Sequence, residues 1–143
     1  MKAIITIIFS AVLLFSNSSS IKAQKSPKHS NKKTTKMDFS KITNSQVKQA
    51  LEALEDNNKE AWFALFTTNA KFTDDGRTMD FKSFFDNAFS KKEKFLTIEK
   101  IENNSKDITG NFYAGQWGTF KVFFKFHQNT DGKFHQLDIG QAK

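Results

Sequence analysis

The amino-acid sequence predicts an α+β domain in which three N-terminal helices pack on one face of a curved, mostly antiparallel sheet. Between residues 43 and 90, apolar side chains recur three and four positions apart, a spacing typical of amphipathic helices. From Phe95 onward the period changes to two, which is typical of strands with one buried face. The chain has no cysteine but contains 17 phenylalanines, so aromatic packing without disulfides has to stabilise the core.

The helical region divides into three predicted helices. The first begins at Thr43 or Asn44, because Thr43 and Gln46 have the spacing of a capping box. A short strand at residues 70–72 follows the second helix, and we expect Asp80 to cap the third. The three apolar stripes are Val47, Ala50, Leu51 and Leu54, then Ala61, Trp62, Leu65 and Phe66, then Phe81, Phe84, Phe85 and Ala88.

Four strands are predicted after the third helix, separated by turns rich in Asn and Gly. They span residues 95–102, 107–114, 119–128 and 133–141. If the turn that ends at Gly132 has two or four residues, the side chains of the last two strands are divided between the two sheet faces in the same way. The apolar face comprises Phe120, Val122, Phe124, Phe126, His135, Leu137 and Ile139, and the polar face comprises Thr119, Lys121, Phe123, Lys125, His127, Phe134, Gln136 and Asp138.

This pairing separates the two histidines of the last hairpin. His127 and His135 point to opposite sides of the sheet, which excludes a common metal or catalytic site unless a bulge shifts the strands. His29, the third histidine, lies far outside the predicted domain. We therefore expect no metal site.

Residues 47–76, VKQALEALEDNNKEAWFALFTTNAKFTDDG, resemble the beginning of NTF2-like domains, the family that includes SnoaL-like proteins and ketosteroid isomerases. Val47, the triplet at residues 64–66 and Ala70 coincide with ketosteroid isomerases without gaps. Asp74 falls where those enzymes keep their general-base aspartate. The resemblance implies a cone-shaped α+β fold that serves enzymes, ligand binders and assembly modules alike.

Two departures from the isomerase pattern argue against steroid-type isomerisation. Ala50 stands where the family has its catalytic tyrosine, and Asp75 stands where a proline follows the aspartate. Without the tyrosine hydroxyl, the site lacks the donor that would stabilise an enolate.

Asp74 and His135 are the candidate catalytic residues if the protein is an enzyme. Asp74 also belongs to the sequence Asp-Asp-Gly-Arg, which is equally typical of a solvated turn. His135 can act as a general acid or base on the apolar face. It can equally be a core histidine bonded to a carbonyl group or to Tyr113. Asp138 and His127 suggest the aspartate–histidine pair of SnoaL-like cyclases, but the predicted pairing places them on the outer face.

Aromatic side chains supply the remaining candidates for a binding site. A planar apolar ligand can be lined by aromatic residues and one histidine. These pocket candidates are Trp62, Phe66, Tyr113, Trp117 and His135. Phe123 and Phe134 are unusual on a polar sheet face, and they predict a homodimer through that face.

The N-terminal region predicts export. Residues 1–23 have a positive start, an apolar run and a polar patch ending at Ala23, which is the layout of a secretory signal peptide. The apolar run of about 13 residues is shorter than the roughly 20 that span a membrane. Residues 24–41 hold six lysines and the only proline, which predicts a disordered Lys-rich leader, and residues 42–143 form the domain. We expect a periplasmic or secreted protein.

The charge distribution argues against a specific nucleic-acid-binding domain. Residues 42–143 carry 14 basic and 14 acidic side chains, so the net charge of +7 comes from the region before them. The leader is suited to weak, salt-dependent contact with anionic surfaces, or it is a solvated spacer.

The sequence leaves two classes of function open. We expect a non-catalytic domain that binds a small apolar molecule or acts as a dimeric interaction module. The alternative is a lyase or isomerase of the SnoaL-like type that works by acid–base chemistry. Neither hypothesis calls for a cofactor.

Overall fold

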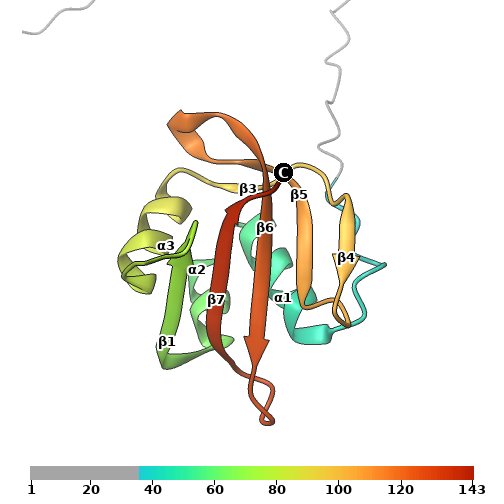
Figure 1. Ribbon diagram of the computed structural model, residues 1–143, viewed down its shortest axis with the longest axis vertical. Helices are drawn as coiled ribbons and strands as arrows, with labels where there is room; N and C mark the ends of the chain where they lie inside the picture. The colour runs from blue at the N-terminus through green and yellow to red at the C-terminus, as the bar shows by residue number, and fades with distance from the viewer. Residues whose placement is uncertain (1–35) are drawn as a thin grey trace, which may run out of the picture. The chain divides into compact units, whose positions relative to one another are not determined.

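A mixed sheet with three α-helices on one of its faces makes up residues 36–143, the part of the chain that the computed structural model describes (Figure 1). Residues 1–35, which include the predicted signal peptide and most of the predicted leader, lie outside the described residues. The α+β class is confirmed. The helices are α1 (Ser45–Glu55), α2 (Lys59–Ala64) and α3 (Phe81–Ser90), with a 3₁₀ turn, η1, at Gly115–Trp117.

Each α-helix begins at a side chain that accepts hydrogen bonds from the first turn. Asn44 caps α1 by accepting from the amides of Gln46 and Val47, each at 3.1 Å. Of the two predicted starts, Asn44 is therefore the cap, and Thr43 instead contacts the Ser105 hydroxyl at 3.0 Å. Such caps satisfy amide groups that have no partner inside the helix.

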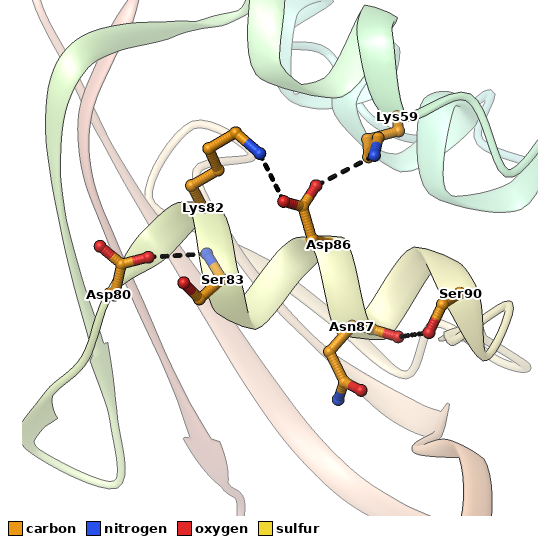
Figure 2. A network of polar contacts seen from close by, with 7 residues as sticks. All are labelled: Lys59, Asp80, Lys82, Ser83, Asp86, Asn87 and Ser90. Carbon is orange, nitrogen blue, oxygen red and sulfur yellow. Dashed lines mark hydrogen bonds and ion pairs between the residues drawn. The ribbon is translucent and has the colours of Figure 1, made fainter.

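Helix α3 is fixed at its start and along its exposed side (Figure 2). As predicted, Asp80 is the cap and accepts from the Ser83 amide at 2.7 Å. Asp86 pairs with Lys82 one turn earlier and with Lys59 of α2 at 3.1 Å. Hydrogen bonds from Lys82 and then Lys59 hold the pKa of Asp86 below its usual value. These pairs are solvent-exposed, so they orient α3 more than they stabilise it.

Seven strands form the sheet in the order β2-β1-β7-β6-β5-β3, with β4 also paired to β5. Strands β1 and β7 run parallel, and the other pairs are antiparallel. The strands are β1 (Phe66–Asp74), β2 (Arg77–Thr78), β3 (Lys94–Phe95), β4 (Lys100–Glu102), β5 (Asp107–Tyr113), β6 (Thr119–Gln128) and β7 (Phe134–Gln141).

The strand predicted at residues 70–72 is part of the longer β1, which forms a hairpin with β2 between α2 and α3. The three helices therefore do not form one N-terminal group before the sheet. The predicted second helix extended to Phe66, but α2 ends at Ala64 and Phe66 begins β1. The Leu65 carbonyl accepts from the Phe134 amide at 2.9 Å, so pairing with β7 overrides the helical spacing of this segment.

The predicted register of the last hairpin is confirmed over most of its length, where Phe124 pairs with Ile139 and Phe126 with Leu137. A bulge then shifts the pairing, so that Gln128 lies opposite Phe134. Two assignments were wrong for this reason. Phe134 points into the core and is completely buried, whereas His135 points outward and is exposed.

The core begins earlier in the chain than residue 42. Phe39 is 5% exposed and belongs to the same cluster as the helix residues, and Met37 packs against that cluster. The folded part therefore includes residues that the sequence assigned to the leader. The largest fully buried side chains are Trp62, Phe72, Phe85, Phe124, Phe126 and Phe134.

Candidate functional site

A pocket of about 340 Å³ opens at one end of the inner sheet face, beneath α3. The carboxyl ends of β1, β5 and β7 meet the start of β6 at this end, which is the upper end in Figure 1. We call it the α3 pocket. Its lining consists of Asp74, Asp75, Phe84, Phe85, Asn87, Ala88, Glu93, Phe112, Ala114, Trp117, Phe120, Val122, Phe124, Ile139, Gly140 and Gln141.

Asp74 ends β1 at the edge of this pocket. It pairs in the sheet with Ile139 and with Arg77. Burial and then the neighbouring charge of Asp75 raise the pKa of Asp74, while Arg77 lowers it by less. Asp75 serves the turn, because its carboxylate accepts from the Gln141 amide at 2.9 Å. The acidic turn thus contains one structural carboxylate and one that faces the pocket.

Glu93, which follows the end of α3, brings a second carboxylate to the pocket. This residue is only 7% exposed. Burial raises the pKa of Glu93 above its usual 4.5, and Lys91 lowers it by less. Within the described part of the chain its carboxylate has no hydrogen bond, and the same is true of Asp74. Both groups are therefore available to a ligand.

The connection between β5 and β6 borders the pocket and contains η1. Gly115 has φ of +59° and lies so close to Glu93 that a Cβ atom there would be 3.1 Å from Oε1. Glycine is needed at this point for both its conformation and its lack of a side chain. The same connection carries Trp117, which is 70% exposed at the mouth of the pocket.

The structure does not bring the sequence-derived pocket candidates together. Trp117 lines the α3 pocket. Trp62 and Phe66 lie in the closed core, with ring centroids 5.0 Å apart. Tyr113 is on the half-exposed surface of β5, and His135 lies outside the pocket on the opposite sheet face. Of the two candidate catalytic residues, only Asp74 reaches the pocket.

The outer sheet face carries a separate polar cluster. His127 Nε2 lies 2.7 Å from Asp138, which also accepts from Thr73 at 2.8 Å and from Gln136 at 2.9 Å. Burial pushes the pKa of Asp138 upward, but the hydrogen bonds from Gln136, Thr73 and His127 outweigh it and hold this pKa below its usual value. The cluster ties β1, β6 and β7 together.

The bulge also brings the two histidines of the hairpin to the same face, with ring centroids 6.1 Å apart. The prediction that His127 and His135 point to opposite sides was therefore wrong. Among residues 36–143, no three His, Asp or Glu side chains are grouped so that they could hold a metal ion.

Phe123 is the one member of the predicted dimer pair that lies on the outer face. Its ring packs over Gly140, and the Lys125 ammonium group lies 5.3 Å from its centroid. It is half-buried by these neighbours.

No helix within the described residues is long and apolar enough to cross a membrane.

Sequence reasoning missed Glu93. The run from Ser90 to Lys94 is polar and resembles a solvated helix end. One signal was present, because Glu93 stands two positions before the buried Phe95, and residues two apart on an extended chain share a face.

Comparison of the structure with solved structures places it in a known fold. It superposes on an NTF2-like protein of unknown function from Cytophaga hutchinsonii with a TM-score of 0.56, 16% identity, and coverage of 70% of this chain and 89% of the other. The chain has the NTF2-like fold. No protein-family model matches the sequence, and no curated protein matches it.

Two further structural neighbours have different roles. The epoxide hydrolase/cyclase-like enzyme SalBIII, from the formation of the pyran ring in salinomycin, matches with a TM-score of 0.53 and 10% identity over 74% of this chain and 95% of its own. The Anabaena orange carotenoid protein, in complex with canthaxanthin, matches with a TM-score of 0.50 and 19% identity over 68% of this chain and 36% of its own. At these identities the likeness concerns the NTF2-like fold alone.

Proposed function

We propose that this NTF2-like domain is a non-catalytic binding module of an exported protein, and that it holds a small, largely apolar molecule in the α3 pocket. The observation that carries this proposal is the pocket itself. Its volume of about 340 Å³ lies within the range of small-molecule sites. Rings from α3, β5, β6 and η1 account for six of its sixteen lining residues and four more are aliphatic, and such a wall favours an apolar body.

The surroundings of the pocket support binding more than assembly. Trp62, Phe66, Phe126 and Phe134 close the opposite end of the inner face by aromatic packing. A second hollow of about 450 Å³ lies between residues 37–42 and residues 98–101, and none of the described residues that line it is aromatic. The Anabaena protein offers a precedent in which a chain containing this fold holds an apolar molecule. The dimeric interaction module retains only Phe123 as its anchor, because Phe134 is in the core.

Native mass spectrometry of the protein, expressed as the complete chain and recovered from the export compartment, tests this proposal. We expect an additional mass on the order of a few hundred daltons that is lost on denaturation. Ala114→Phe is the matched control, because residue 114 lines the pocket and a larger side chain there fills it. A mass without adduct, or an adduct that persists in Ala114→Phe, would contradict the proposal.

A second candidate is a lyase or isomerase that uses acid–base chemistry in the same pocket. It is favoured by Asp74, whose raised pKa suits a general base. This reading predicts that Asp74→Asn abolishes turnover of a substrate while ligand binding and folding persist. If Asp74→Asn leaves turnover unchanged, Asp74 is not the base.

A further inference from the structure

We propose that the occupant of the α3 pocket is an organic cation, an amine whose ammonium group pairs with the Glu93 carboxylate while its apolar body packs on the aromatic wall. This inference rests on the proposed function, because it names the chemical class of the molecule in the same pocket. Three features of the structure lead to it: the way α3 ends, the charges in the lining and the rings around them.

The end of α3 forces Glu93 into the interior. The Glu93 amide donates to the Ala88 carbonyl at 3.0 Å, and the Lys92 amide donates to the Phe89 carbonyl at 3.1 Å. These two bonds form a Schellman motif, in which Lys92 adopts the left-handed conformation at φ of +55°. The residue in the position of Glu93 commonly makes an apolar contact with the last turn of the helix. Here a carboxylate occupies that buried position.

The Glu93 carboxylate keeps some contact with solvent in the pocket, but its partial burial without a hydrogen-bond donor among residues 36–143 weakens the folded state, so an acidic residue here needs a reason outside folding. An apolar residue at 93 would complete the Schellman motif and close the inner end of the pocket. Glu93 instead presents Oε1 beneath Gly115, where no described side chain donates to it. The hydrogen-bond donor that this group lacks is therefore best supplied by a ligand.

The charged side chains that residues 36–143 contribute to the lining are all acidic. They are Asp74, Asp75 and Glu93, without a lysine, arginine or histidine from this part of the chain. Lys91 and Arg77 act on these carboxylates from outside the lining, and burial outweighs both of them. Asp75 is already bonded to the Gln141 amide, so Asp74 and Glu93 are the free acceptors. This field attracts a cation and opposes an anion.

The wall complements the charge. Phe112, Phe120 and Trp117 border the pocket on the side of the β5–β6 connection. Aromatic faces attract cations as well as apolar groups, and Trp provides the strongest such contact. An alkyl or aryl amine satisfies both the rings and the carboxylates, whereas a neutral hydrocarbon satisfies the rings alone.

Cation binding should depend on pH with a defined sign. A bound ammonium group favours ionised Glu93, so affinity is greatest above the raised pKa of Glu93 and falls as pH decreases through it. The titratable and charged groups around Glu93 are Lys91 on its own turn and, across the pocket, Asp74 and Asp75, with Arg77 beyond them. The pKa of Asp74 is also raised. Protonation of Asp74 and protonation of Glu93 therefore both weaken cation binding as pH decreases.

Three molecules with one carbon skeleton test the inference: 4-phenylbutan-2-amine, 4-phenylbutan-2-ol and 4-phenylbutan-2-one. They present a cation, a neutral donor and an acceptor to the same pocket. Titration calorimetry of the purified complete chain at neutral pH should give at least a tenfold lower Kd for the amine than for the alcohol or the ketone. The amine should lose this advantage as the buffer is made more acidic.

Glu93→Gln keeps the shape of the side chain and removes its charge, so it should bring the amine to the level of the alcohol. Glu52→Gln is the matched control, because Glu52 is a half-exposed glutamate on α1 outside the pocket. If the alcohol or ketone binds as well as the amine, or if Glu93→Gln retains the preference, the cation inference is wrong while pocket binding stands. If none of the three binds the wild type and Ala114→Phe behaves identically, the proposed function itself fails.

Discussion

The two ends of the inner sheet face are built from the same kinds of side chain but differ in what they enclose. At the end near the β6–β7 turn, Phe134 packs 4.9 Å from Phe126 and 5.2 Å from Phe66, measured between ring centroids. We call this the closed end. At the α3 end, Phe112 and Phe120 border a pocket of about 340 Å³.

The difference arises from what faces the rings. At the closed end the bulge in β7 turns Phe134 inward, and Trp62 of α2 packs on Phe66 from the other side. At the α3 end the facing positions hold Ala88, Ala114 and Glu93, which are too small or too polar to fill the space. Aromatic content therefore does not decide which end of this domain is hollow. The small or polar residues opposite the rings decide it.

The largest expected effect is a difference in stability between the two ends. Phe134→Ala should lower the free energy of unfolding by about 3–5 kcal/mol, because it leaves a cavity in a closed cluster. Phe120→Ala should cost less than about 1 kcal/mol, because Phe120 is 37% exposed beside existing empty space. Urea unfolding of both variants measures this contrast. Equal losses would show that the α3 end is packed as tightly as the closed end.

Filling the pocket tests the same comparison in the other direction. Ala114→Phe should change the free energy of unfolding by no more than about 1 kcal/mol, because the added ring enters empty space instead of a packed core. Ala50→Phe is the matched control on α1, where Ala50 is completely buried and the same change should cost about 1–3 kcal/mol or more. Thermal unfolding compares the two directly. A loss in Ala114→Phe as large as in Ala50→Phe would contradict the open pocket.

The sequence predicted the elements of the fold better than either end of the inner face, since it assigned Trp62 and Phe66 to a pocket and Phe134 to the outer face, whereas all three form the closed end. Periodicity gave the helix stripes, the strand pairs Phe124–Ile139 and Phe126–Leu137, and Asp80 as the cap of α3. It failed at His135, because the bulge adds one residue to the start of β7 and so reverses the side-chain directions there. Nothing in the sequence of the turn reveals this bulge. It also failed for Glu93, whose burial depends on a left-handed Lys92 where a glycine would have been the usual signal.

A smaller effect concerns the outer face, which supports both ends by holding β1 beside β7. Asp138→Asn should lower the free energy of unfolding by about 1 kcal/mol, because it weakens hydrogen bonds from Thr73 and His127. The folded-state pKa of Asp138 lies below 3.8, so its stabilising contribution is present above that pH and disappears as pH falls through the lowered pKa. Denaturant titrations should therefore show the wild type and the variant converging in acid. A difference that persists unchanged in acid would rule out the carboxylate as its cause.

The smallest expected effect has the opposite sign and belongs to the α3 end. The folded-state pKa of Glu93 is raised above 4.5, so the folded protein binds a proton more readily than the unfolded chain, and stability is lost as pH rises through this pKa. Glu93→Gln removes this loss, so the variant should be slightly more stable than the wild type at neutral pH and equal to it in acid. The difference in unfolding free energy between the wild type and the variant reports on Glu93 alone, because Asp138 and the other carboxylates are present in both proteins. An amine that binds at Glu93 should stabilise the wild type by mass action, and at the same concentration it should stabilise the variant less. A variant that is less stable than the ligand-free wild type at neutral pH would mean that Glu93 has a structural partner, and the case for a ligand-binding carboxylate would then be lost.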